Sequence, residues 1–201
     1  NAGSVTTQTV PVNTSGSYTV TFTNGNGCST ASAATVVTVN PLPIIAEGTL
    51  TSPTSCGSAT GSIEVTGSGT GNVTWSGSAS GSATGVTLPY VIPTLGAGNY
   101  NITFENGNGC VSSVLSSSLS DPTPPSTPTI SVTGATTFCD GGSVTLTSSQ
   151  STGNVWSTTA TSSSITVTSS GSYSVTVTDV NGCAATSAAT TVNVSNAPAP
   201  T

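Results

Sequence analysis

Apolar and polar residues alternate along much of the chain. The run Tyr-Thr-Val-Thr-Phe at 18–22 is one example, and Thr-Val-Val-Thr-Val at 35–39 is another. Such alternation is typical of a β-strand with one buried face. Thr and Val also favour pleated, half-buried surfaces. The pattern therefore predicts an all-β protein built from antiparallel strands, with Ser and Thr on its solvent faces.

One segment occurs three times, at residues 16–28, 98–110 and 171–183. Each copy has a Tyr near its start and ends in Asn-Gly-Cys, with ten residues from the Tyr to the Cys. Asn-Gly favours the positive φ angles of a tight hairpin turn, so the return strand is expected to begin at the Cys. The copies repeat after 82 and 73 residues, which suits a small β-sandwich better than a solenoid unit.

Proline-rich connectors separate the repeats, as in Asn-Pro-Leu-Pro at 40–43. Such connectors are extended and semi-rigid. We predict the C-terminal part of an Ig-like sandwich over 1–43, a complete sandwich over 44–127, and an Ig-like sandwich with a proline-rich tail over 128–201. These tandem antiparallel β-sandwiches are expected to form an elongated array of beads.

Five cysteines with wide spacing indicate disulfides and an oxidising compartment. The second and third repeats each have an early cysteine and a late one, which predicts the bridges Cys56–Cys110 and Cys139–Cys183, each inside one sandwich. The first repeat has no early cysteine, so Cys28 is expected to be unpaired within these residues. Its partner would lie upstream in a longer chain, or on a neighbouring subunit that also supplies the missing strands.

The aromatic residues fit the same plan. Trp75 and Trp156 each follow an early cysteine and are expected to pack beside the two bridges. Tyr18, Tyr100 and Tyr173 occupy the same place in the three copies, among alternating apolar residues. This placement favours core positions over a sugar-binding face.

Tyr90 lies outside the common pattern. It belongs to Leu-Pro-Tyr-Val-Ile-Pro at 88–93, which has no counterpart in the third repeat. We predict a surface-exposed apolar patch here, and Tyr90 is the candidate for a surface contact.

The charge distribution excludes several function classes. The chain has no Lys, Arg or His, and six acidic residues give a net charge of −6. Binding to nucleic acid by phosphate neutralisation and docking on anionic lipid both need basic residues. Catalysis by a Ser-His-Asp or Cys-His arrangement needs a histidine. The acidic residues are dispersed along the sequence, so we expect no enzyme and no catalytic residues.

Metal binding and membrane insertion have little support either. Glu47, Asp121 and Asp140 are the candidates for calcium ligands at the sandwich junctions, together with backbone carbonyls. The chain has no Asp-x-Asp-x-Asp-Gly loop, and calcium needs several oxygen ligands, so we expect no metal and no cofactor. No apolar run is long enough to cross a bilayer.

Several motifs together carry a resemblance to a known family. They are Pro-Thr-Ser-Cys at 53–56, Leu-Gly-Ala-Gly-Asn-Tyr at 95–100 and Asn-Gly-Asn-Gly-Cys at 106–110, with Phe-Cys-Asp-Gly-Gly at 138–142 in the third repeat. The second repeat resembles the repeat of Bacteroidota gliding adhesins of the SprB type, and the third is similar to the Ig-like repeats of the same surface proteins.

The resemblance implies an extracellular, cell-surface protein exported by the type IX route, with a role in adhesion, gliding or filament building. We therefore expect a structural stalk or filament segment of a long bacterial surface adhesin. Its partners would be neighbouring repeats of the same chain and other copies in a filament. The alternative is a module that binds a glycan or a solid surface through its Thr and Ser rows or through Tyr90.

Overall fold

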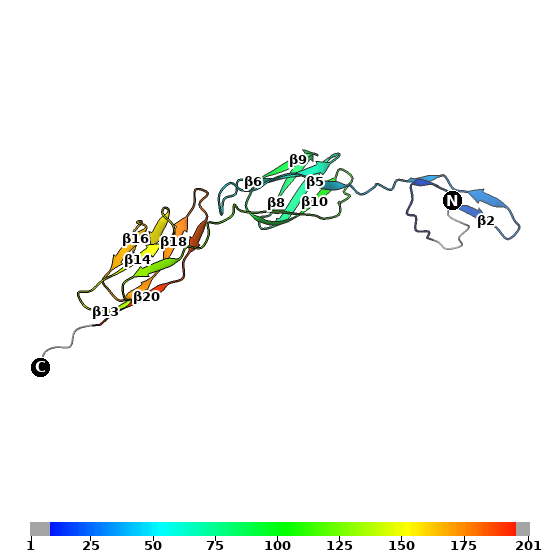
Figure 1. Cartoon of the computed structure of the whole chain (residues 1–201). Coiled ribbons are helices and arrows are strands. Elements are labelled where there is room, and N and C mark those ends of the chain that lie inside the picture. The colour runs from blue at the N-terminus through cyan, green and yellow to red at the C-terminus, as the bar shows by residue number, and fades with distance from the viewer. Residues whose placement is uncertain (1–8, 196–201) are drawn as a thin grey trace.

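The structure is a computed structural model that describes residues 9–195, and it has no helix among them. No segment within these residues could therefore cross a bilayer as an apolar helix. The strands form three bodies that follow one another along the chain (Figure 1). The second and third bodies each have their own hydrophobic core. Their sheets confirm the predicted all-β sandwich fold.

The second body is a sandwich of two antiparallel sheets. Its sheets have the strand orders β5-β6-β9 and β11-β10-β7-β8. The apolar residues of β6 and β10 alternate inward, and Ile63, Val65, Ile102 and Phe104 are fully buried between the sheets. The strands are β5 (Ile45–Thr51), β6 (Gly61–Gly67), β7 (Thr70–Gly77), β8 (Gly81–Thr87), β9 (Tyr90–Leu95), β10 (Gly98–Asn106) and β11 (Leu115–Leu119).

The third body has a three-stranded sheet, β12-β14-β16, against the strand groups β15-β18-β19 and β13-β20-β17. All pairs are antiparallel except β13 with β20, which run parallel. Val144, Leu146, Trp156, Val175 and Val192 are buried in its core. The strands are β12 (Ile130–Thr133), β13 (Thr137–Cys139), β14 (Val144–Ser148), β15 (Asn154–Trp156), β16 (Ser164–Val167), β17 (Gly171–Tyr173), β18 (Val175–Thr178), β19 (Ala184–Thr186) and β20 (Thr190–Ser195).

All three bodies contain the same tyrosine hydrogen bond. The hydroxyl donates to the backbone carbonyl four residues upstream, at 2.8 Å for Tyr18, 2.9 Å for Tyr100 and 3.0 Å for Tyr173. This tyrosine corner is a hallmark of Ig-like sandwiches. Tyr100 and Tyr173 are buried, which confirms the predicted core role for both, and Tyr18 is half-buried.

The first body is half of such a sandwich in the part that the structure describes. It consists of the pairs β1·β4 and β2·β3, with β1 (Gly16–Tyr18), β2 (Thr21–Thr23), β3 (Ser29–Ala31) and β4 (Thr35–Val37). Val20 and Phe22 are 72% and 68% exposed. Their counterparts in the third sandwich, Val175 and Val177, are 0% and 6% exposed. The first body therefore presents the inner face of a sandwich to solvent.

The repeated Asn-Gly-Cys turn is wider than the predicted tight turn. The Oδ1 atom of Asn106 accepts the N–H groups of the second and fourth residues after it, at 3.0 and 3.1 Å. Gly109 has a φ of 76°, a conformation that favours glycine. Asn24 and Asp179 make the same pair of contacts in the other two copies. An amide or a carboxylate oxygen therefore closes the same loop, with the cysteine at its end.

Candidate functional site at the sandwich junction

A disulfide joins the second sandwich to the third. It links Cys56 to Cys183, with 5.0 Å between the Cα atoms and 127 residues between them in sequence. The predicted bridges Cys56–Cys110 and Cys139–Cys183 are therefore wrong. Cys110 and Cys139 have free thiols among the described residues, as does Cys28.

The predicted bridges fail because each pair of cysteines lies at opposite ends of its own sandwich. The Cys56 Sγ atom is 3.6 Å from the carbonyl of Pro122, in the connector that leaves the second sandwich. The Cys110 Sγ atom is instead 3.9 Å from the carbonyl of Asn40, in the connector that enters it. Strand β10 runs the length of the body between these ends, about 30 Å for its nine residues. A disulfide needs Cα atoms about 4.4–6.8 Å apart.

The third sandwich is arranged in the same way. Cys183 ends the turn after β18, at the end that faces the second sandwich, and its Sγ atom is 3.5 Å from the Pro122 carbonyl. Cys139 ends β13 and stands opposite Ser195, where the last described strand finishes. The late cysteine, Cys183, therefore lies at the end of the third sandwich that faces the second one. The early cysteine, Cys139, lies at the opposite end.

Backbone contacts surround the disulfide. The Cys56 N–H donates to the carbonyl of Asn181 at 3.0 Å, within the turn of the third sandwich. The Gly57 N–H donates to Oδ2 of Asp121 at 3.3 Å, which ties the early loop to the exit connector. Cys183 is only 1% exposed. The loop of one sandwich, the connector and the turn of the next therefore meet at a single point.

The two tryptophans pack in or against the sandwich cores, and neither has the predicted position beside an intradomain bridge. Trp156 is buried, and its Nε1–H donates to the carbonyl of Ser162 at 2.8 Å. Trp75 is partly buried against the second core. Neither can flank an intradomain bridge, because the described residues contain none.

The predicted apolar patch around Tyr90 is wrong. Leu88 and Ile92 belong to the second core, and Tyr90 packs partly buried against it. Val91 is the exposed member of this stretch, at 49%. The segment forms β9, which pairs with β6 and completes the sheet rather than a surface patch.

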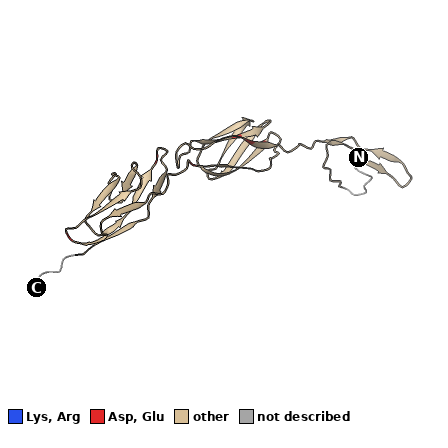
Figure 2. Cartoon of the chain, in the orientation of Figure 1, with Lys and Arg blue, Asp and Glu red and all other residues tan. Residues whose placement is uncertain are grey.

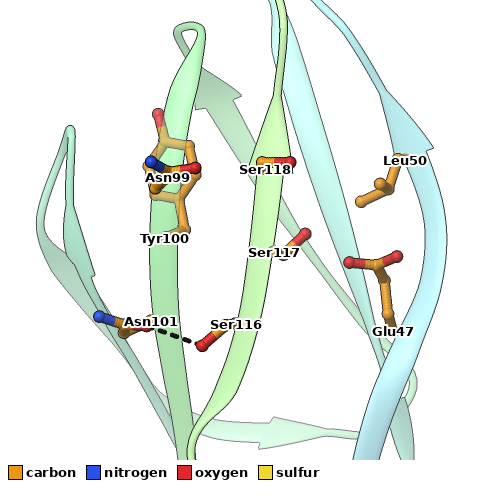
Figure 3. A pocket seen from close by; sticks show the side chains of 8 residues that line it. All are labelled: Glu47, Leu50, Asn99, Tyr100, Asn101, Ser116, Ser117 and Ser118. Atoms are coloured by element: carbon orange, nitrogen blue, oxygen red, sulfur yellow. Dashed lines mark hydrogen bonds between the residues drawn. The ribbon is translucent and has the colours of Figure 1, made fainter.

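A shallow polar groove of about 440 Å³ lies between the edge strands of the two sheets in the second sandwich (Figure 3). Glu47 and Leu50 come from β5, and Ser116, Ser117 and Ser118 come from β11. The hydroxyl of Ser117 is buried and has no hydrogen-bond partner. Tyr100 also lines the groove, but it is only 1% exposed and offers no open ring face for stacking.

The acidic residues do not gather. Among residues 9–195 no three His, Cys, Asp or Glu side chains lie close enough to hold a metal ion. The ribbon coloured by charge is tan almost throughout (Figure 2). Of the calcium candidates, Asp121 accepts from Gly57, Asp140 accepts from the Gly141 N–H at 3.0 Å, and Glu47 lines the groove. Each lies in a different place, so the structure does not bring these three carboxylates together.

Comparisons with known proteins add only a weak structural likeness. No protein-family model matches the chain, and no curated protein matches it. Among solved structures, the chain is similar to the fibronectin(III)-like modules of CbhA from Clostridium thermocellum, at 15% identity. The match covers 75% of this chain and 95% of that one, with a TM-score of 0.27.

Proposed function

We propose that this chain is a structural stalk segment of a long extracellular bacterial surface adhesin, rather than an enzyme. The observation that carries the proposal is the Cys56–Cys183 disulfide, because it joins two separate sandwiches instead of closing one. Disulfides are typical of oxidising, extracellular compartments. The resemblance to gliding-adhesin repeats supports the same class of protein.

The junction limits bending between the two sandwiches. A single proline-containing connector would leave them free to swing about one covalent link. The disulfide adds a second covalent link, and the Cys56 N–H to Asn181 contact adds a hydrogen bond beside it. Two links side by side resist rotation that one link allows. A stalk needs this property to hold a terminal binding part away from a cell.

Peptide mapping tests the junction itself. The chain has no Lys or Arg, so Asp-N is a better protease than trypsin. Cleavage before each Asp leaves the peptides 1–120, 121–139, 140–178 and 179–201, which separate Cys139 from the other cysteines. Without reductant, we expect 1–120 linked to 179–201. A link between 121–139 and 179–201 would refute the junction.

Electron microscopy and small-angle scattering test the stalk. The native protein should be a thin beaded rod on the cell exterior. In scattering, the oxidised 201-residue chain should show a narrower range of dimensions than its Cys56→Ser variant. Cys28→Ser is the matched control, because Cys28 is free in this chain. A compact particle, or identical scattering from the oxidised chain and the Cys56→Ser variant, would contradict the stalk proposal.

A second candidate function is glycan or surface binding at the groove between β5 and β11. It is favoured by the unpartnered hydroxyl of Ser117, because a buried polar atom without a partner can be satisfied by a ligand. Glu47, Asn99 and Asn101 supply further hydrogen-bonding groups to a sugar. A glycan array with the wild-type chain and Glu47→Gln would test it. Equal signals from both proteins, or none from either, would exclude the groove.

A further inference from the structure

Three positions in the chain are structurally equivalent. Each lies five residues after the residue that pairs with the corner tyrosine. The tyrosine partners are Thr35, Ser117 and Thr190. The three equivalent positions are Asn40, Pro122 and Ser195.

These positions differ in which cysteines they hold. At Pro122, an early cysteine and a turn cysteine meet and are bonded, with both sulfurs within 3.6 Å of its carbonyl. At Asn40 only the turn cysteine Cys110 is present, 3.9 Å from the carbonyl. At Ser195 only the early cysteine Cys139 is present, in the strand pair β13·β20. The positions at Asn40 and Ser195 therefore each hold one of the two kinds of cysteine that are bonded at Pro122.

We propose that Cys110 and Cys139 are the two open halves of the same inter-sandwich junction. Cys110 takes an early cysteine of the sandwich before it, and Cys139 takes the Asn-Gly-Cys turn of a further repeat. The proposal rests on the stalk function, and it names the partner as another repeat of this kind. Every sandwich would then be locked to the next by one disulfide of the Cys56–Cys183 type.

The bond forms by thiol–disulfide exchange. Two thiols are oxidised to one disulfide, and their two electrons and two protons pass to a small-molecule or protein disulfide, which becomes two thiols. Cys139 is exposed and Cys110 is partly exposed, so both sulfurs are open to such a reagent. Cys183, which is already bonded, is buried. Cys56, the other bonded cysteine, is partly exposed.

The open face of the first body supports the Cys110 half independently. In the third sandwich β20 pairs with both β17 and β13, and β18 pairs with both β15 and β19. In the described part of the first body, their counterparts β4 and β2 each pair on one edge alone. The strand missing beside β4 corresponds to β13, whose last residue is the early cysteine Cys139. Its cysteine would therefore stand opposite Asn40, within reach of Cys110.

The same missing strands would cover the exposed apolar face. Val20 and Phe22 correspond to Val175 and Val177, which are both buried in the third sandwich. Val175 belongs to the core that also contains Val144 and Leu146 of β14. The occupant that we assign is the first half of an Ig-like repeat, standing before β1 in the same polypeptide as β12–β16 stand before β17. One segment would thus supply both the missing cover and the missing thiol.

Disulfide mapping of the native protein, as isolated from the cell surface, tests this proposal. The free thiols are first blocked with iodoacetamide, and the protein is then cleaved with Asp-N and Glu-C without reduction. We expect Cys110 and Cys139 to resist the reagent in the native protein. In the isolated 201-residue chain, both should react fully while Cys56 and Cys183 do not. Cys139 should be linked to a peptide that contains Asn-Gly-Cys, and Cys110 to a peptide from an earlier repeat.

Several results would overturn the proposal. Alkylated Cys110 or Cys139 in the native protein would do so, as would a direct Cys110–Cys139 bond. Release of a second polypeptide on reduction would refute the same-chain occupant of the first body. If Cys56–Cys183 is present while the other two are free, this inference fails and the stalk function stands. If Cys56–Cys183 is itself absent, both fail.

Discussion

The disulfide between sandwiches should control how the chain responds to pulling from its ends. Tension entering at the N-terminal side reaches Cys56, crosses the disulfide to Cys183 and continues to the C-terminal side. Strands β6 to β18 lie between these two cysteines and are bypassed. The cores that contain Phe104 and Leu146 are therefore shielded from load while the bond is intact.

The size of the effect follows from the sequence separation. The loop spans 127 residues, and an extended chain covers about 3.3–3.6 Å per residue. Breaking the bond should therefore release about 420–460 Å of additional contour length. In the oxidised chain, only residues outside the loop can extend, such as those of β5 and β20.

Single-molecule force spectroscopy with handles at the two termini measures this length directly. The oxidised wild-type chain should lack the extension, and Cys183→Ser or added reductant should restore it as separate unfolding steps of the two sandwiches. Cys28→Ser is the matched control, because Cys28 is exposed and unbonded. If the oxidised wild type already extends by the full 420–460 Å, the bond does not carry the load and the mechanical reasoning is wrong.

Three further predictions concern the sandwiches themselves. Phe104→Ala should destabilise the second sandwich by about 3–5 kcal/mol in a denaturant titration, whereas Phe22→Ala should change the stability of this chain by less than about 0.5 kcal/mol, since Phe104 is fully buried and Phe22 is exposed. Tyr100→Phe should cost about 1 kcal/mol in the same titration through loss of the corner hydrogen bond; an unchanged midpoint would argue against that bond. Asp179→Asn should keep the stability of the third sandwich within about 0.5 kcal/mol of wild type, because an amide oxygen closes the same turn in the other copies. Asp179→Ala should cost about 1–2 kcal/mol of stability, because it removes the oxygen that accepts two backbone N–H groups. Equal losses for the two variants in a thermal melt would refute this role.

Most of the fold could be predicted from local patterns. Alternation in β6, β10 and β14 produces the buried faces that were expected, and the Tyr-to-Cys spacing marks one hairpin in each body. The corner tyrosines also take their predicted core positions in the second and third sandwiches. These features depend on residues within one strand or one turn, so the sequence contains them in full.

The segment around Tyr90 shows where local reasoning failed. Its Leu-Pro-Tyr-Val-Ile-Pro sequence has no counterpart in the third repeat, which suggested a surface insertion. Leu88 and Ile92 are core residues because β9 pairs with β6 and fills the edge of a sheet. Which apolar strand is covered depends on its partners in the sheet, and no local pattern names those partners.

By itself, the sequence determined the strand periodicity and the repeated turn, and it indicated that cysteines of this chain form disulfides. Only the tertiary structure decided which cysteines meet. Cys56 and Cys110 look like a natural pair in sequence, yet β10 holds them at opposite ends of one body, while the connector at Pro122 brings Cys56 to Cys183. A disulfide needs its two Cα atoms within a few ångströms, and that distance is set by how whole sandwiches follow one another.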